Sequence, residues 1–300
     1  YTMKLMNVTR RMMCSLLLAV FVLNVSAVER LLIVGDAVWG GWHIPNSFIM
    51  VNTDEQPDVW KATVNLNANA GFKLLTQTCW GGLEFRAGNE DVMLTVGVPS
   101  TLVSSNDDNG KDCKFKVSEK ANYDVVCDLV NNKITVTKSA YQDADIKHPA
   151  LWMVGSATPG NWSVEDGTIL VQDATNPNVF ATTVDLVEGE MKIAVNKYGA
   201  FDQTFYLRDM NDETKMVFGG DDNKWYITKA GKYDVKVDVS AMTISIKEHA
   251  DVETGISAVK VEQSAAVSHY TLAGAKATGI TKGLTIVVDS NGKAKKVLKY

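Results

Sequence analysis

Two sets of aromatic and nitrogen-bearing residues recur along the chain in the same order. The first set is Trp42, Lys73, Gln77 and Trp80. The second set is Trp162, Lys192, Asn196 and Tyr198, and Arg86 and Arg208 follow the two sets as further candidates. Aromatic rings stack well on partners with a flat apolar face, as sugars have. Amine, guanidinium and amide groups supply the directed hydrogen bonds that sugar hydroxyls need. The pattern therefore predicts carbohydrate binding.

Core packing is the alternative for every one of these aromatic residues. For Trp42 and Trp162 the residue types alone leave surface binding and core packing open. Trp60 and Phe180 alternate with apolar residues inside strand-like runs, so we expect both in a core. Tyr123 and Tyr233 each begin a "YDV" motif, and we expect both in core or corner positions.

The two sets belong to a long internal repeat. At an offset of 120 residues, "VGDAVWGGW" (34–42) matches "VGSATPGNW" (154–162), and "TVNL" (63–66) matches "TVDL" (183–186). At an offset of 110 residues, 115–138 lies over 225–248. The first copy holds about ten extra residues, which we place in the loop "VPSTLVSSNDDNGKDC" (98–113). Two copies of this length predict tandem domains and not a solenoid.

The local pattern is that of strands throughout. Runs such as "YDVKVDV" (233–239) and "TISIK" (243–247) alternate apolar and polar residues and are separated by short turns. We predict an all-β chain with two tandem immunoglobulin-like β-sandwich modules plus a small C-terminal β-module. The expected parts are a signal peptide at 1–27, module 1 at 28–138, a linker at 139–149, module 2 at 150–248, and a β tail at 255–300 that serves in sorting or attachment.

Charge and the leader restrict the function further. A basic start, the apolar run "MMCSLLLAVFVLNV" and the small-residue end "VSA" are typical of a secretory signal peptide. Loss of its three basic residues takes the formal net charge from −5 to about −8, and an acidic chain does not suit nucleic acid. We expect an exported protein at the outer membrane or cell surface, or outside the cell. Of its cysteines, Cys127 is expected in the core, and a Cys79–Cys113 bridge is as probable as two free thiols.

Catalytic motifs are absent from the sequence, so we expect no enzyme. There is no nucleophile elbow, zinc-protease helix, P-loop or dinucleotide fingerprint. His148 and His249 are expected in solvated loops near domain boundaries. The acidic clusters 106–112 and 219–223 have oxygen ligands that calcium accepts, although hairpin turns are the favoured interpretation. We therefore expect no catalytic residue, no metal ligand and no cofactor other than a structural calcium ion.

The repeated motifs resemble a known family. "VGDAVWGGW" and "VGSATPGNW", followed by "FKLLTQTCW" (72–80) and "MKIAVNKY" (191–198), are similar to the carbohydrate-binding domains of SusE/SusF-type starch-binding outer-membrane proteins. The resemblance implies non-catalytic β-sandwich modules that bind α-glucan at the bacterial cell surface. It implies platforms of Trp42 with Trp80 and of Trp162 with Tyr198, with Lys73 and Lys192 bonding sugar hydroxyls.

The resemblance also bears on partners and on the tail. It implies a polysaccharide partner, α-glucan first, with other outer-membrane glycan-uptake components as further partners and no nucleic acid. The tail "HYTLAGAKATGITKGLTIVVDSNGKAKKVLKY" resembles the C-terminal sorting modules of type IX export. The alternative function is a structural or adhesive surface protein whose sandwiches contact protein.

Overall fold

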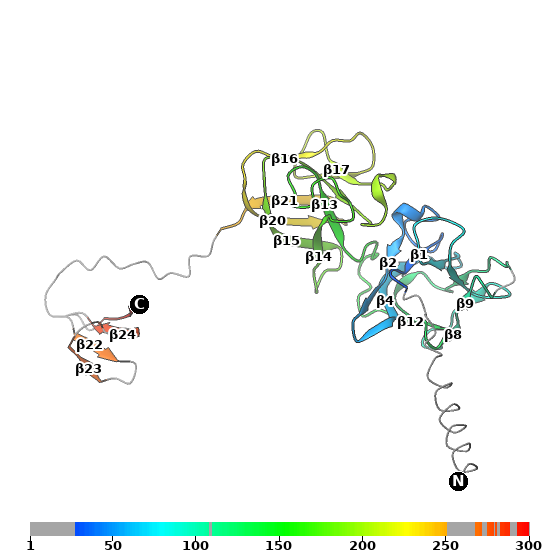
Figure 1. The fold of residues 1–300 in the computed structure, drawn as a ribbon, viewed down its shortest axis with the longest axis horizontal. Helices are drawn as coiled ribbons and strands as arrows, with labels where there is room; N and C mark the ends of the chain where they lie inside the picture. The colour runs from blue at the N-terminus through cyan, green and yellow to red at the C-terminus, as the bar shows by residue number, and fades with distance from the viewer. Residues whose placement is uncertain are drawn as a thin grey trace, which may run out of the picture. The chain divides into compact units, whose positions relative to one another are not determined.

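The computed structural model describes residues 28–107, 110–250, 268–271, 275–278, 280, 283–288 and 293–299 (Figure 1). The expected signal peptide at 1–27 lies outside the described residues. The chain divides into two compact units, Tyr1–His249 and Ala250–Tyr300. The described part is all-β, as predicted, with two single-turn 3-10 helices, η1 (Ile44–Asn46) and η2 (Ala200–Asp202).

The first module packs two five-stranded sheets against each other. One sheet has the order β2-β1-β5-β6-β9, the other has the order β3-β4-β11-β12-β8, and β7 pairs with β10. The strands are β1 (Leu32–Val34), β2 (Phe48–Ile49), β3 (Val51–Thr53), β4 (Gln56–Leu66), β5 (Lys73–Leu75), β6 (Glu84–Arg86), β7 (Val92–Met93), β8 (Ser100–Thr101), β9 (Val103–Ser104), β10 (Phe115–Lys116), β11 (Ala121–Asp128) and β12 (Lys133–Lys138).

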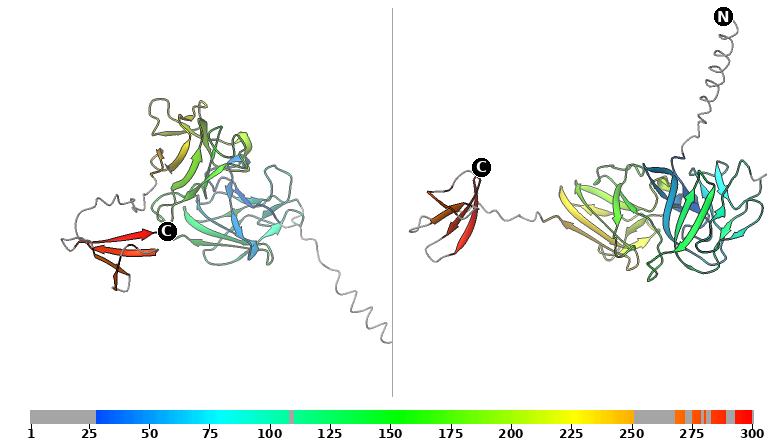
Figure 2. Two further views of the ribbon diagram at one scale, coloured as in Figure 1. Left: turned by 60° about the vertical axis from the view of Figure 1, so that its left-hand side comes forward. Right: turned by 90° about the horizontal axis from the view of Figure 1, so that it is seen from below.

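The second module repeats this plan in one continuous sheet that folds over on itself. Its strands are drawn in green to yellow in Figure 2. Their order is β18-β17-β16-β13-β14-β15-β20-β21, and β19 pairs with β16. The strands are β13 (Leu151–Val154), β14 (Thr168–Gln172), β15 (Val179–Leu186), β16 (Gly189–Ala194), β17 (Tyr206–Arg208), β18 (Met216–Phe218), β19 (Trp225–Ile227), β20 (Gly231–Asp238) and β21 (Thr243–Glu248).

Each module has its own apolar core, and the core predictions are confirmed. Trp60 is 4% exposed in the first core and Phe180 is fully buried in the second. Tyr123 and Tyr233 are also buried, and each hydroxyl donates to the carbonyl four residues earlier, that of Glu119 and of Lys229. This local bond matches the tyrosine corner of β-sandwiches, which ties a strand start to the preceding turn.

A third apolar cluster joins the two modules. Side chains alternate across a strand: Ile33 of β1 and the preceding Leu31 enter the core, while Leu32 and Val34 face the second module. In β13 of the second module, Leu151 and Met153 enter its own core, while Trp152 and Val154 face the first module at this cluster. A strand buried on both faces needs a continuous apolar run. This explains why "LLIV" and "LWMV" do not alternate.

His148 lies in this junction, which corrects the expected solvated loop. Its side chain is buried, its ring packs edge-on against Trp39 at 4.8 Å, and it shares a 3.0 Å hydrogen bond with the Tyr206 hydroxyl. Burial, helped by the charge of Lys147, lowers the pKa of His148 to about 3. His249 is partly buried against Asp234, with 2.8 Å between Nδ1 and the carboxylate.

The cysteines and the tail complete the fold. Cys79, Cys113 and Cys127 are free, so the bridge considered for the first two is not formed, and Cys127 is buried as predicted. The second unit is a four-stranded sheet of order β23-β22-β24-β25. Its strands are β22 (Ser268–Thr271), β23 (Lys276–Ala277), β24 (Gly283–Val288) and β25 (Ala294–Lys299). Of the tail expected at 255–300, residues 255–267 and the pair 291–292 lie outside the described residues.

Candidate glycan-binding site

The loop after the first strand of each module places the repeated Trp. In module 1 this loop closes with a hydrogen bond from the Gly35 amide to the Gly41 carbonyl, and in module 2 with one from the Gly155 amide to the Asn161 carbonyl. Gly35 has φ 144°, and a Cβ there would lie 2.2 Å from the Gly71 carbonyl oxygen. A side chain cannot fit so close to the backbone. The repeated Gly therefore fixes the loop, and the loop fixes the Trp.

Trp42 and Trp80 form an aromatic pair on module 1. Their ring centroids lie 6.3 Å apart with planes at 43°, and Trp80 is 49% exposed. Together with Lys73, Asp112 and Lys114 they line a hollow of about 290 Å³. The sequence prediction that Trp42, Lys73 and Trp80 come together agrees with this placement.

The charges of this hollow are paired with one another. Lys73 is buried, and its Nζ lies 2.6 Å from Glu84 and 2.9 Å from Asp112. Lys114 reaches Asp112 at 3.0 Å from the other side. Burial raises the pKa of Asp112, but hydrogen bonds from Lys73 and Lys114 outweigh it and leave this pKa below its ordinary value. Each ammonium also faces a ring, Lys73 that of Trp80 at 4.8 Å and Lys114 that of Trp42 at 5.7 Å.

Module 2 builds a similar group from equivalent positions. Asp222 lies 2.9 Å from both Lys192 and Lys224. Lys224 faces the ring of Trp162 at 6.0 Å, and Lys192 faces that of Phe201 at 5.3 Å. As at Asp112, burial raises the pKa of Asp222, while bonds from the two Lys bring it below its ordinary value.

The two groups correspond residue by residue, and sequence reasoning missed part of this. Asp112 and Lys114 lie 110 positions before Asp222 and Lys224, at the offset that aligns the second halves of the modules. The shared pattern Asp-x-Lys-aromatic at 112–115 and 222–225 was the signal that could have revealed them. Phe201 carried no such signal, because the loop before it has a different length in the two copies.

Two predicted ligand residues of module 2 lie elsewhere. Tyr198 packs against the cluster between the modules, where the Arg30 guanidinium lies 4.4 Å from its ring. Among the described residues, Trp162 makes no ring contact with Tyr198 or with Phe201, so the expected platform of Trp162 with Tyr198 is not formed, and Phe201 stacks on Phe205 instead. Asn196 is fully buried, and its Nδ2 donates to the hydroxyl of Ser47 at 3.1 Å. Its amide therefore connects the modules and does not face a ligand.

Gln77, Arg86 and Arg208 hold parts of the backbone near the two groups and are not among the residues that line the hollow of module 1. The amide of Gln77 fills the space above Gly82, where a Cβ would lie 1.3 Å from its Nε2. Arg86 pairs with Glu84 at 2.8 Å and donates to the Lys111 carbonyl. Arg208 likewise donates to the Lys224 carbonyl at 3.0 Å. Both arginines thus hold the segments that carry the Asp and Lys of the site.

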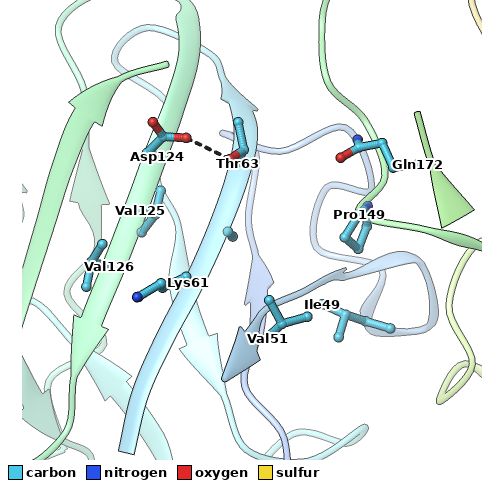
Figure 3. A pocket seen from close by; sticks show the side chains of 10 residues that line it. Ile49, Val51, Lys61, Thr63, Asp124, Val125, Val126, Pro149 and Gln172 are labelled. Atoms are coloured by element: carbon cyan, nitrogen blue, oxygen red, sulfur yellow. Dashed lines mark hydrogen bonds between the residues drawn. The ribbon is translucent and has the colours of Figure 1, made fainter. Parts of the chain in front are cut away.

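Another hollow, of about 320 Å³, lies away from the aromatic residues (Figure 3). It opens beside β4 and β11, and Pro149 and Gln172 face it across the gap. Its Asp124 carboxylate accepts a 2.6 Å hydrogen bond from Thr63. No aromatic ring is among the residues that line it, so it offers nothing on which a sugar face could stack.

In the described part of the chain, the acidic clusters 106–112 and 219–223 form ion pairs with lysines. Asp112 and Asp222 are the residues of these clusters that the site uses, and each carboxylate is bracketed by two ammonium groups. Across the described ranges, no group of three or more His, Cys, Asp or Glu side chains is gathered as a metal site. Asp108 and Asn109 lie outside those ranges. Nor does any helix there have the length and apolar character needed to cross a membrane.

Comparison with known proteins gives a family match for the second module. Residues 150–245 match the family of SusF/SusE starch-specific carbohydrate-binding modules. The resemblance seen in the sequence is thereby confirmed. A solved structure, that of SusF from Bacteroides thetaiotaomicron, also aligns at 13% identity and a TM-score of 0.27, covering 89% of this chain and 71% of that chain. No curated protein sequence matches. The SusF/SusE match supports starch binding as the general class of function.

Within this SusF/SusE-type module the match spans every residue of the second group. Trp162, Lys192, Phe201, Asp222 and Lys224 all fall inside 150–245. Module 1 lies outside the match, but it has the same loop, the same Lys and the same Asp-Lys pair. The internal repeat thus places an equivalent group of residues in the first half of the chain, outside the matched range.

Proposed function

We propose that the chain binds polysaccharide, α-glucan first, without cleaving it, at the bacterial cell surface. The observation that carries the proposal is the repeated Lys-Asp-Lys chain, in which each ammonium faces an aromatic ring in both modules. A glucan that curves over Trp42 and Trp80 would stack its sugar faces on the rings. The exposed edge of Asp112 and the ammonium of Lys114 then meet its hydroxyls.

Module 2 acts in the same way with a different aromatic partner. Here Trp162 and Phe201 supply the rings, and Phe201 is 52% exposed. Asp222, itself half exposed, lies between Lys192 and Lys224 and can accept from a hydroxyl. Phe201 replaces Tyr198 in our proposal, because the Lys192 ammonium faces the Phe201 ring, whereas Arg30 and Lys197 face the Tyr198 ring.

Two sites on one chain raise the apparent affinity for a long polymer. Once one module is bound, the second meets the same polymer at a high effective concentration. The apolar cluster between the modules removes the freedom of a flexible linker. We further propose that the tail serves export or attachment, and that binding keeps starch near the surface for other uptake proteins.

Affinity electrophoresis in gels containing amylopectin tests the proposal. The wild-type protein should be retarded, Trp42→Ala and Trp162→Ala should each lose part of the retardation, and the double variant should migrate as in a gel without polysaccharide. Trp60→Phe, in the core of module 1, is the matched control and should be retarded like the wild type. Undiminished retardation of a folded double variant would refute the proposal.

A further inference from the structure

The two modules differ at one open edge of the sandwich. In module 2 a groove of about 820 Å³ lies between β19 and β21. Its walls are made of Trp225, Tyr226 and Ile227 on one side and Ile244 and Ile246 on the other. Tyr226 is 57% exposed. Polar and charged side chains, Arg208, Glu213, Lys224 and Lys247 among them, complete the lining. The groove has the size of a ligand site. It contains none of the rings proposed to stack on sugar, and Lys224 is the residue that it shares with the candidate glycan site.

Module 1 fills the equivalent groove with its own chain. The strand β7 pairs in parallel with β10, and the amide of Leu94 donates to the Lys116 carbonyl at 2.8 Å. The chain then crosses the opening, and the amide of Gly97 donates to the Val136 carbonyl at 2.8 Å. Leu94 is 4% exposed and belongs to the module 1 core. The segment 92–102 thus crosses the opening from β7 to β8, with a turn in which the Val98 amide donates to the Thr95 carbonyl, and it covers this edge of the sandwich.

Module 2 has no counterpart of this crossing segment among its described residues. The chain between β17 and β19 is shorter, and it reaches β21 near its start, where the Ile244 amide donates to the Thr214 carbonyl. Beyond that point, the positions of β21 that correspond to the covered positions of β12 in module 1 are not covered by the described chain. Val136 is fully buried, whereas its counterpart Ile246 is partly exposed.

The register shows which backbone groups the groove presents. Val136 pairs with Val125, and Ile246 pairs with Val235 at the same position of the repeat. Because the Val136 carbonyl points outward to accept from Gly97, the Ile246 carbonyl faces the groove in the same way. The strand β19 pairs with β16 on its inner side, and the counterpart of β7 on its outer side is missing from the described chain.

We propose that the β19–β21 groove of module 2 binds an extended, uncharged peptide segment of a partner protein. The peptide would add as a strand, with main-chain bonds to β19 and to Ile246 and an apolar side chain where Leu94 inserts in module 1. The argument for this occupant is the segment 92–102 of module 1, which contains no charged residue and sits on the equivalent surface. Module 1 closes its own groove and module 2 receives a partner.

A peptide with the sequence of residues 91–102, DVMLTVGVPSTL, labelled with a fluorophore, tests this inference on the whole mature protein. We expect saturable binding by fluorescence anisotropy, and a loss of about tenfold or more in Tyr226→Ala and in Ile246→Lys. Tyr226 has an exposed ring, so its truncation keeps the test valid if Ile246→Lys does not fold. Lys116→Ala, the equivalent of Tyr226 in module 1, should bind the peptide like the wild type.

Starch binding separates this inference from the function proposed above. All three variants should keep the wild-type retardation in amylopectin gels, because none of the changed residues belongs to the aromatic sites. Absence of saturable peptide binding by the wild type would overturn the proposal. Binding that is equally strong in Tyr226→Ala and in the folded Ile246→Lys variant would overturn it as well.

Discussion

The two modules place a buried lysine at the same point but surround it differently. Lys73 lies between two carboxylates, Glu84 at 2.6 Å and Asp112 at 2.9 Å. Lys192 keeps the equivalent of the second carboxylate, Asp222 at 2.9 Å, and faces the ring of Phe205 at 4.1 Å. The strand registers place Glu84 next to Leu75, and Phe205 takes the corresponding place before Tyr206 in module 2. A buried carboxylate in one module is thus an aromatic ring in the other.

The difference shows how one scaffold can give a lysine two roles. An ammonium has three N–H groups, and Lys73 directs two of them at carboxylates. In the described contacts, Lys192 donates to Asp222 alone. We therefore expect Lys73 to act mainly in stability and Lys192 to have more capacity for sugar hydroxyls. Lys73 would help binding mainly by orienting Asp112 and by facing Trp80.

Removal of the buried carboxylate should give the largest effect. Glu84→Gln leaves the Lys73 ammonium with a half-exposed partner, and we expect a loss of about 3 kcal/mol in the free energy of unfolding. Asp222→Asn, whose side chain is 57% exposed, should cost less than about 1 kcal/mol. Urea unfolding followed by Trp fluorescence measures both. Equal losses in the two variants would mean that the modules hold their lysines in the same way.

Acid should destabilise the contact between the two modules at His148. The pKa of His148 falls from 6.5 to about 3 on folding, so the unfolded chain binds the extra proton between these values. Stability is therefore complete above pH 6.5 and falls below it, by about 2 kcal/mol at pH 5. His148→Gln keeps a hydrogen-bonding group that does not titrate. Urea midpoints at pH 7 and pH 5 should differ less in this variant; an unchanged difference would exclude His148 as the cause.

Replacement of Lys73 and replacement of Lys192 should weaken sugar binding to different degrees. Each is replaced by Met in a background where the other module has lost its Trp, so that one site is measured at a time. Lys192→Met should weaken maltoheptaose binding about tenfold, or 1.4 kcal/mol, because donors to the hydroxyls are lost. Lys73→Met should weaken it by a smaller factor. Calorimetric titration gives both constants, and a larger loss for Lys73→Met would reverse the assigned roles.

The exposed rings should show the smallest difference. Trp80→Ala removes a larger stacking face than Phe201→Ala, so we expect losses of about 1.5 and about 1 kcal/mol in binding. Because the carboxylate pKa values of Asp112 and Asp222 are lowered, both sites should bind equally well from pH 8 to pH 5. Titrations of the single variants and of the wild type across this range measure both effects. An equal loss at both rings would show that ring size does not matter.

Sequence reasoning predicted the architecture better than the site. Strand alternation and the repeat gave two sandwiches, and the repeated Gly and Trp marked the loops that carry Trp42 and Trp162. The carboxylates were missed because acidic residues in turns look alike until the fold brings a lysine to them. Tyr198 and Asn196 were misplaced for another reason. Packing between modules leaves no period in the sequence, and the continuous apolar runs of β1 and β13 are explained only once the structure shows both faces of these strands buried.

The central claim is that each module has one site built from its own aromatic pair. Calorimetric titration of the mature protein with maltoheptaose tests it most directly, using Trp42→Ala/Trp80→Ala, Trp162→Ala/Phe201→Ala and the variant that combines all four changes. The account predicts two sites per chain in the wild type, one in each double variant and none in the combined variant, with far-UV circular dichroism unchanged. Two sites in either folded double variant would contradict it.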